Sequence, residues 1–238
     1  MKQLSIVIPC FNEESNIPII LERFSEIITS DNIEIILVNN GSVDNSQSVI
    51  DSLIPSYRFA KSIYIKENQG YGYGILEGLK HASGNYVGWT HADLQTDPKD
   101  IIKVIRILEN IHIDNKNIFI KGNRKGRPLS DTIFTVGMSL FESVLLKSRM
   151  WDINAQPTIF HRSFLAKLSD APKDFSLDLF SYYLAKRSKF EIIRFNVAFP
   201  EREHGTSSWN VDLPSKVRFI KRTINYSFSL KKRFKEEI

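Results

Sequence analysis

The stretch that decides the fold is Tyr86-Val87-Gly88-Trp89-Thr90-His91-Ala92-Asp93-Leu94-Gln95-Thr96-Asp97-Pro98. Its first four residues are β-forming, and the residues after them change abruptly to polar side chains. Thr96 or Asp97 can cap a helix that has Pro98 at its first position, and the apolar residues that follow have helical spacing. The stretch therefore predicts a strand, a polar loop at the carboxyl end of that strand, and then a helix.

Three side chains of this loop can act together on a ligand, namely His91, Asp93 and Gln95. Open α/β sheets bind their ligands at the carboxyl ends of strands. Alternate residues of an extended segment point the same way, so we expect these three side chains to converge. An imidazole, a carboxylate and an amide oxygen can hold a divalent cation and, through it, a diphosphate. The alternative is a capped loop whose polar residues only face solvent.

The residues before this stretch repeat the alternation of strand and helix. Buried strands are predicted at 4–9, 34–38 and 62–65, and apolar residues at helical spacing follow each of them. Four such units in about a hundred residues predict an α/β fold with a doubly wound, mostly parallel sheet and helices on both faces. The glycines at 70, 72 and 74 do not form G-x-G-x-x-G, and G-x-x-x-x-G-K-[ST] is absent. A dinucleotide dehydrogenase and a P-loop enzyme are therefore disfavoured.

The pattern changes after Asn110, where strands and helices become less regular. No linker, low-complexity stretch or internal repeat separates this second half, so we expect one domain over 1–210 and a C-terminal helix over 211–238. The predicted second-half elements are strands at 118–121, 158–160 and 192–199, helices at 130–146 and 176–186, and loops at 122–128 and 201–209.

Composition indicates a globular protein of the cytoplasm. The 238 residues are 42% hydrophobic, enough for one large domain, and no apolar run approaches the roughly 18 residues that span a bilayer. The single cysteine, Cys10, excludes an internal disulfide and fits a reducing compartment. The amino-terminal residues lack the layout of a signal peptide. We expect a cytoplasmic protein, with the inner face of the cell membrane as a place of attachment.

The net charge of +5 is concentrated near the carboxyl end. Residues 213–235 contain eight Lys or Arg and no Asp or Glu, so this segment carries +8 and the remainder −3. Its apolar residues at 217, 220, 224 and 228 have helical spacing. Such a helix can make peripheral contact with an anionic membrane or pack on the body with its basic side solvated, and both interpretations stay open. Nucleic-acid binding is not expected, because the body is net acidic.

Four motifs occur in order over residues 4 to 98. They are Ile8-Pro9-Cys10-Phe11-Asn12-Glu13-Glu14-Ser15-Asn16-Ile17, Glu34-Ile35-Ile36-Leu37-Val38-Asn39-Asn40-Gly41-Ser42-Val43-Asp44, Asn68-Gln69-Gly70-Tyr71-Gly72 and His91-Ala92-Asp93-Leu94-Gln95-Thr96-Asp97-Pro98. Together they resemble the motifs of family 2 glycosyltransferases. The resemblance implies a GT-A fold, inverting transfer of a sugar from a UDP- or GDP-sugar donor, and a divalent cation, Mn²⁺ or Mg²⁺.

The second half is similar, more loosely, to the dolichyl-phosphate mannose synthase branch of that family. The similarity rests on Gly122-Asn123-Arg124, the stretch 152–160 and the loop 202–209. It implies a polyprenyl phosphate or cell-envelope glycan acceptor, with a soluble hydroxyl acceptor as the alternative. Residues 1–110 would then bind the nucleotide-sugar and residues 111–210 the acceptor.

The resemblance also implies roles for single residues. Asp93 is the expected metal ligand and catalytic centre, supported by His91 and Gln95. Gly70 and Gly72 would let the backbone approach the nucleotide closely. The residues implied around the nucleoside are Pro9, Asn12, Glu13, Asn39 and Asn40.

Phosphate recognition is expected from Arg124, Arg202 and His204, because guanidinium forks match phosphate oxygens. The alternative for Arg124 is an ordinary salt bridge. A hydroxyl acceptor would require a carboxylate base, for which Asp152 and Asp178 are available. A phosphate acceptor is already ionised and needs none.

Two departures from the family pattern bear on activity. Asn39 and Asn40 stand where the family has aspartates, so each position gains a hydrogen-bond donor. His91 replaces the first metal-binding aspartate, which suits Mn²⁺ better than Mg²⁺. These changes leave open a catalytically weakened nucleotide-sugar-binding protein of the same fold.

Overall fold

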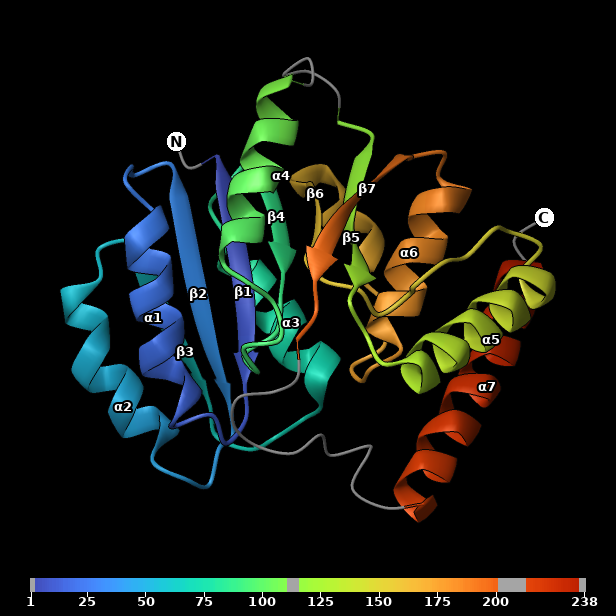
Figure 1. Ribbon diagram of the computed structural model, residues 1–238, viewed down its shortest axis with the longest axis horizontal. Coiled ribbons are helices and arrows are strands. Elements are labelled where there is room, and N and C mark those ends of the chain that lie inside the picture. The colour runs from blue at the N-terminus through green and yellow to red at the C-terminus, as the bar shows by residue number, and fades with distance from the viewer. Residues whose placement is uncertain (1–2, 111–115, 201–212, 236–238) are drawn as a thin grey trace.

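The computed structural model describes residues 3–110, 116–200 and 213–235 (Figure 1). The strands are β1 (Leu4–Cys10), β2 (Ile33–Asn40), β3 (Ala60–Ile65), β4 (Tyr86–Trp89), β5 (Ile118–Lys125), β6 (Thr158–His161) and β7 (Glu191–Ala198). The α-helices are α1 (Asn16–Ile27), α2 (Ser46–Leu53), α3 (Tyr71–Lys80), α4 (Lys99–Asn110), α5 (Leu129–Leu145), α6 (Leu177–Arg187) and α7 (Leu213–Lys235). Two short 3₁₀ helices, η1 (Ile54–Ser56) and η2 (Arg162–Leu168), complete the described elements.

The described strands form one seven-stranded sheet in the order β3-β2-β1-β4-β6-β5-β7. Pairs β1–β2, β2–β3, β1–β4 and β5–β7 are parallel, whereas β6 runs antiparallel to both β4 and β5. Six strands therefore end at the same edge, which is the lower edge in Figure 1. The predicted mostly parallel, doubly wound sheet is confirmed.

Apolar side chains fill both faces of the sheet, because successive residues of a strand point to opposite sides. In β1, Ile6 and Ile8 pack with α1, α2 and α4, while Val7 packs on the other face with α3, α6 and the end of α7. Trp89 and Phe160 are fully buried in the second layer. Continuous apolar runs such as 35–38 are expected where both faces of a sheet are covered.

Most predicted elements agree with the structure, and their ends differ by a residue or two. Strand β5 is the clear exception, since it continues to Lys125 through residues predicted as loop. Its partner β7 explains the extension, because the parallel register holds up to Lys125 opposite Ala198. At α4, the Asp97 carboxylate accepts a hydrogen bond from the Lys99 amide (2.9 Å), so Asp97 caps a helix that begins one residue after Pro98.

Helix α7 packs on the body beside α5 (Figure 1). Leu230 and Phe234 are buried, and the Ser227 hydroxyl donates to the buried Glu142 carboxylate of α5. The apolar stripe of α7 is only partly covered, because Val217 and Phe228 are each 54% exposed while Ile220 and Ile224 are half-buried, and membrane contact through this helix stays a prediction. Within the part of the chain that the structure describes, none of the helices combines the length and apolarity that a bilayer crossing requires.

Candidate functional site

The loops after β1 and β2 are tied together by the residues expected around a nucleoside. The Asn12 side chain accepts a hydrogen bond from the Val43 amide (2.9 Å), and the Asn12 amide donates to Ser42 Oγ (3.0 Å). The Glu13 amide donates to Ser46 Oγ (2.9 Å) in the same way. Pro9 lies at the half-buried end of β1. These contacts fix the shape of the edge where β1 and β2 end.

Asn39 and Asn40 are buried, and each uses its amide as donor and acceptor. Asn39 Nδ2 donates to Gln47 Oε1 (2.8 Å), while Asn39 Oδ1 accepts from the Ser42 amide (3.0 Å). Asn40 Nδ2 donates to the Gly70 carbonyl (2.9 Å). A carboxylate cannot make either donation, so the two asparagines are matched to this loop arrangement.

Gly70 and Gly72 do permit a close approach, but the approaching chain is the protein's own. A Cβ on Gly70, whose φ is +104°, would lie 2.5 Å from the Lys173 carbonyl oxygen. A Cβ on Gly72 would lie 2.6 Å from the Pro172 carbonyl oxygen. The Tyr73 amide donates to the Lys173 carbonyl (2.9 Å), so the start of α3 is held against the loop before α6. The expected role of these glycines toward a nucleotide stays a prediction.

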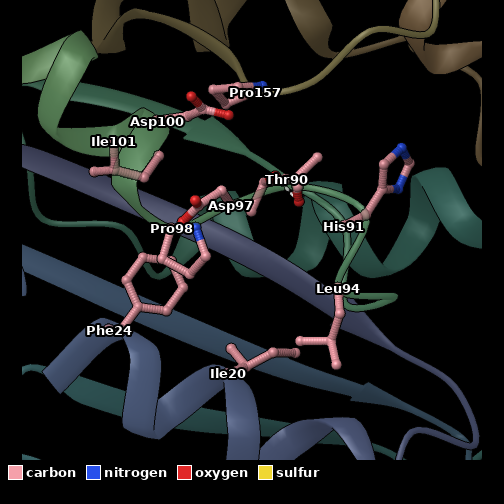
Figure 2. Close-up of a pocket in the computed structure, with 11 residues that line it drawn as sticks. Ile20, Phe24, Thr90, His91, Leu94, Asp97, Pro98, Asp100, Ile101 and Pro157 are labelled. Atoms are coloured by element: carbon pink, nitrogen blue, oxygen red, sulfur yellow. Dashed lines mark hydrogen bonds between the residues drawn. The ribbon is translucent and has the colours of Figure 1, made fainter. Parts of the chain in front are cut away.

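The loop after β4 is not the extended segment that the sequence predicted. Strand β4 ends at Trp89, and Leu94 adopts a φ of +59°. Asp93 Oδ1 accepts a hydrogen bond from the Gln95 amide (3.2 Å), which closes a turn. Leu94 points into a crevice of about 10 Å³ beside Ile20, whereas the His91 ring points away from it (Figure 2). This crevice supports the loop and is too small for a ligand larger than water.

The three candidate metal ligands lie in this turn with different surroundings. Asp93 is buried, and Gln95 Nε2 donates to the Pro200 carbonyl (2.9 Å). The His91 ring lies 5.7 Å from the Tyr71 ring, centroid to centroid. A carboxylate, an imidazole and an amide oxygen are ligand types that divalent cations accept, and the cation site expected from these three residues stays a prediction. Among the described residues, no group of three or more His, Cys, Asp and Glu could hold a metal by itself.

A buried polar network lies beneath this edge around Asp178. Asp178 Oδ1 accepts hydrogen bonds from Gln156 Nε2 (2.6 Å) and Trp89 Nε1 (3.2 Å). Lys121 Nζ lies 3.6 Å from the same oxygen and donates to Thr158 Oγ1 (2.8 Å). Burial lowers the pKa of Lys121 to about 8, although the nearby Asp178 charge opposes that shift. The network joins β4, β5, β6 and α6 at one point.

Tyr71 connects this network to the metal-ligand turn. Burial, and then the charges of Asp178 and Asp93, raise the pKa of Tyr71 well above its usual range. Gln156 Nε2 donates to the Tyr71 hydroxyl (3.5 Å) and the Tyr71 ring lies 5.7 Å from the His91 ring, so Tyr71 lies between the Asp178 network and the turn that contains His91 and Asp93. Sequence reasoning missed Tyr71, Lys121 and Gln156 as site residues. The only sequence signal for Lys121 is a lysine inside an apolar strand run.

Arg124 is held in an ion pair with Asp152. Arg124 donates to Asp152 from its backbone amide (2.8 Å) and its Nε (2.8 Å), and Arg194 Nη2 lies 4.0 Å from the same carboxylate. Burial acts to raise the pKa of Asp152, but Arg124 outweighs it and the net shift is downward. With two guanidinium groups against it, Asp152 is poorly suited to act as a base. Arg202 and His204 lie outside the described residues.

Comparison with known proteins identifies the family. The sequence model of glycosyl transferase family 2 matches residues 5–164, two thirds of the chain. Undecaprenyl-phosphate 4-deoxy-4-formamido-L-arabinose transferase of Yersinia enterocolitica is 33% identical over 113 residues, which are 46% of this chain and 34% of the relative. The Photorhabdus laumondii enzyme of the same name is 24% identical over 216 residues, 88% of this chain and 64% of the relative. The chain thus spans between a third and two thirds of these relatives.

Solved structures show the same fold at low sequence identity. Glucosyl-3-phosphoglycerate synthase of Mycobacterium tuberculosis, in complex with Mn²⁺, UDP and glucosyl-3-phosphoglycerate, superposes with a TM-score of 0.71 at 14% identity. The superposition covers 97% of this chain and 80% of that one. The fold expected from the resemblance is therefore confirmed as GT-A. From the family match and this fold together, the chain belongs to glycosyl transferase family 2.

Proposed function

We propose that the protein is an inverting glycosyltransferase that moves a sugar from a nucleoside-diphosphate sugar to a polyprenyl phosphate. The observation that carries the proposal is the position of Asp93, at the end of β4 and beside the loops of β1 and β2, in a chain of glycosyl transferase family 2. The names of the bacterial relatives, which are undecaprenyl-phosphate sugar transferases, support the acceptor.

In this proposal the donor lies across the carboxyl ends of β1, β2 and β4. The tied loops that contain Asn12 and Asn39 form the wall beside the nucleoside. Asp93, with His91 and Gln95, would hold a divalent cation, and Mn²⁺ suits this donor set best. When bound, that cation supplies positive charge next to the leaving diphosphate.

Asp178 has a positioning role if the acceptor is a phosphate. Three side chains already occupy its surroundings, namely Gln156, Trp89 and Lys121, so it is fixed in place beneath the edge. A phosphate acceptor attacks as an anion and requires no base. A soluble hydroxyl acceptor would instead require Asp178 to take a proton.

The alternative is a nucleotide-sugar-binding protein of the same fold with weakened catalysis. One observation favours it. The side-chain NH₂ groups of Asn39 and Asn40 donate to Gln47 Oε1 and the Gly70 carbonyl, so their donors are used within the protein and not on a nucleotide. Both alternatives predict donor binding. Only the first predicts turnover.

Release of nucleoside diphosphate from a panel of UDP- and GDP-sugars tests the proposal, with Mn²⁺, Mg²⁺ or EDTA present. We expect release from one donor that requires the cation and falls at least about a hundredfold in Asp93→Asn. The matched control is Asp97→Asn, an exposed position of the same loop whose amide oxygen can still cap α4. Binding without release with every acceptor class would favour the alternative, and no binding at all would contradict the donor site.

We further propose that the protein contacts the membrane peripherally through residues 213–235. The helical segment carries +8 while the rest of the chain carries −3. A lipid-phosphate acceptor would lie in that membrane, so this contact would bring the acceptor close to the carboxyl edge of the sheet.

A further inference from the structure

Helix α5 has a stripe of exposed apolar side chains along one face, while polar side chains in its second half are buried against the body. Leu129, Ile133, Val136, Leu140 and Val144 are between 42% and 75% exposed. Their steps of four, three, four and four residues place them on one face of the helix. An exposed apolar stripe along a whole helix is rare on a monomeric protein and marks an interaction surface.

The opposite face of α5 accounts for this inversion. The Glu142 carboxylate is buried and accepts the Ser227 hydroxyl of α7, and the buried Ser139 Oγ accepts a hydrogen bond from the Asp152 amide (3.1 Å). The polar face is therefore fixed against the body by specific contacts. The apolar face is consequently held outward and cannot turn inward without breaking them.

Helix α7 continues this surface and adds positive charge to it. The Phe141 ring of α5 and the Phe228 ring of α7 are 6.3 Å apart, centroid to centroid, and Phe228 and Val217 are both 54% exposed. Arg218 and Lys221 are among the exposed cations of the same helix. The α5/α7 face, defined by these exposed side chains, thus combines an apolar stripe with a cationic helix.

We propose that the α5/α7 face docks on the surface of an anionic lipid bilayer, with the α5 stripe in the apolar boundary of the headgroup layer and the α7 cations against the lipid phosphates. The proposal rests on the lipid-phosphate acceptor proposed above and identifies α5 as the inserting element. Its seventeen residues span about 25 Å, a length suited to lying in the plane of the interface.

The charge of α7 favours a bilayer over a second copy of the chain. A two-fold contact through this face would bring two helices of +8 toward each other, and like charges at a contact are repulsive. An anionic bilayer supplies the opposite charge, and each Lys or Arg near such a surface adds to the attraction.

Flotation with lipid vesicles tests the proposal on the full chain. The vesicles contain phosphatidylcholine alone or phosphatidylcholine with about 30% phosphatidylglycerol, whose negative surface potential attracts polybasic segments. The stripe variant is Ile133→Ser with Leu140→Ser, and the charge variant is Lys221→Glu with Lys235→Glu. The matched controls are Tyr64→Ser, an exposed aromatic residue on edge strand β3, and Arg58→Glu, an exposed cation beside η1.

We expect the wild type to float with the anionic vesicles only, and both double variants to lose at least about tenfold in partitioning. In the stripe variant each lost aliphatic side chain is worth about tenfold, and in the charge variant each lost cation is worth about fivefold near an anionic surface. The controls should bind as the wild type does. Because the changed side chains are exposed, thermal unfolding should be unaltered. Vesicle binding that is absent from the wild type, or unchanged in the stripe variant, would overturn the proposal.

Two further measurements separate bilayer docking from dimer formation and from the proposed glycosyltransferase function. A wild-type dimer in analytical ultracentrifugation that the stripe variant converts to monomer, without vesicle binding, would assign the stripe to a second copy and overturn the bilayer. Nucleoside diphosphate release from a soluble donor should be the same in the stripe variant and the wild type. A protein that binds vesicles but releases no nucleoside diphosphate would refute the proposed function and leave the docking surface standing.

Discussion

Glu142 gives the fold a pH dependence that can be measured directly. Its carboxylate is buried between α5 and α7, Oε1 accepts the Ser227 hydroxyl, and Oε2 has no hydrogen-bond partner among the described residues. Burial raises the pKa of Glu142 to about 7, although the Ser227 hydrogen bond opposes the rise. The folded state therefore holds a proton between pH 4.5 and 7 that the unfolded state has lost. The stability from this group is complete below pH 4.5 and disappears as the pH rises through 7.

The size of the effect follows from the shift. The pKa of Glu142 rises from 4.5 to about 7, and at about 1.36 kcal/mol for each step of one in pKa the stability changes by about 3 kcal/mol in all, most of it between pH 5 and pH 8. Glu142→Gln keeps the shape and cannot ionise, so its free energy of unfolding should not show this loss. Urea unfolding of both proteins at pH 5, 6, 7 and 8 measures the difference between them.

From pH 5 to pH 8 the free energy of unfolding of the wild type should fall by about 2–3 kcal/mol relative to that of Glu142→Gln. Glu34→Gln is the matched control, because hydrogen bonds from Ser5 and Ser83 outweigh burial and lower the pKa of Glu34 to about 2. Its contribution changes only in the acid range below pH 5. Parallel curves for the wild type and Glu142→Gln would refute the reasoning.

Three other changes have defined outcomes. Asp152→Ala should lower the free energy of unfolding in urea by about 3–5 kcal/mol, because it leaves Arg124 partly buried without its partner. Asp170→Ala, at the exposed pair with Arg233, should lower it by less than about 1 kcal/mol, and equal losses would contradict the buried ion pair of Arg124 with Asp152. The pKa of Lys121 is about 8 in the folded state, below its unfolded value, so between pH 8 and pH 10 the unfolded state binds more protons and the wild type gains stability as the pH rises. Lys121→Met should remove this gain, and the same change of stability with pH in both proteins would contradict the lowered pKa. Gly70→Ala should cost about 1–3 kcal/mol in thermal unfolding, because its Cβ would press on the Lys173 carbonyl, and a neutral effect would disprove that contact.

The sheet could be predicted because its first strands are runs of mostly apolar residues. Residues 4–9 and 34–38 are buried on both faces and end at polar loops, so each run marks a strand and each end marks the site edge. The same reasoning failed for the loop after β4. Leu94 has a positive φ, which an apolar residue rarely adopts, so the alternation expected from His91 to Gln95 does not exist.

Contacts between distant residues explain what could not be predicted. Lys121 and Asp178 are 57 positions apart, and only the fold brings that lysine to the carboxylate. In α7 the apolar spacing left membrane contact and packing on the body both open, and it could not show that Ser227 is buried against the Glu142 carboxylate while Val217 and Phe228 are exposed. Buried polar pairs of this kind depend on the three-dimensional fold, and no periodic pattern in the sequence predicts them.

Transfer to lipid is the most direct test of the central claim. The protein would be incubated with Mn²⁺, undecaprenyl phosphate in anionic vesicles and the radiolabelled donor that supports nucleoside diphosphate release. The organic phase would then be separated and counted. We predict label in the lipid fraction that requires both the cation and the lipid phosphate and is lost in Asp93→Asn. Label that stays in the aqueous phase, on free sugar or a soluble hydroxyl acceptor, would contradict a lipid-phosphate glycosyltransferase.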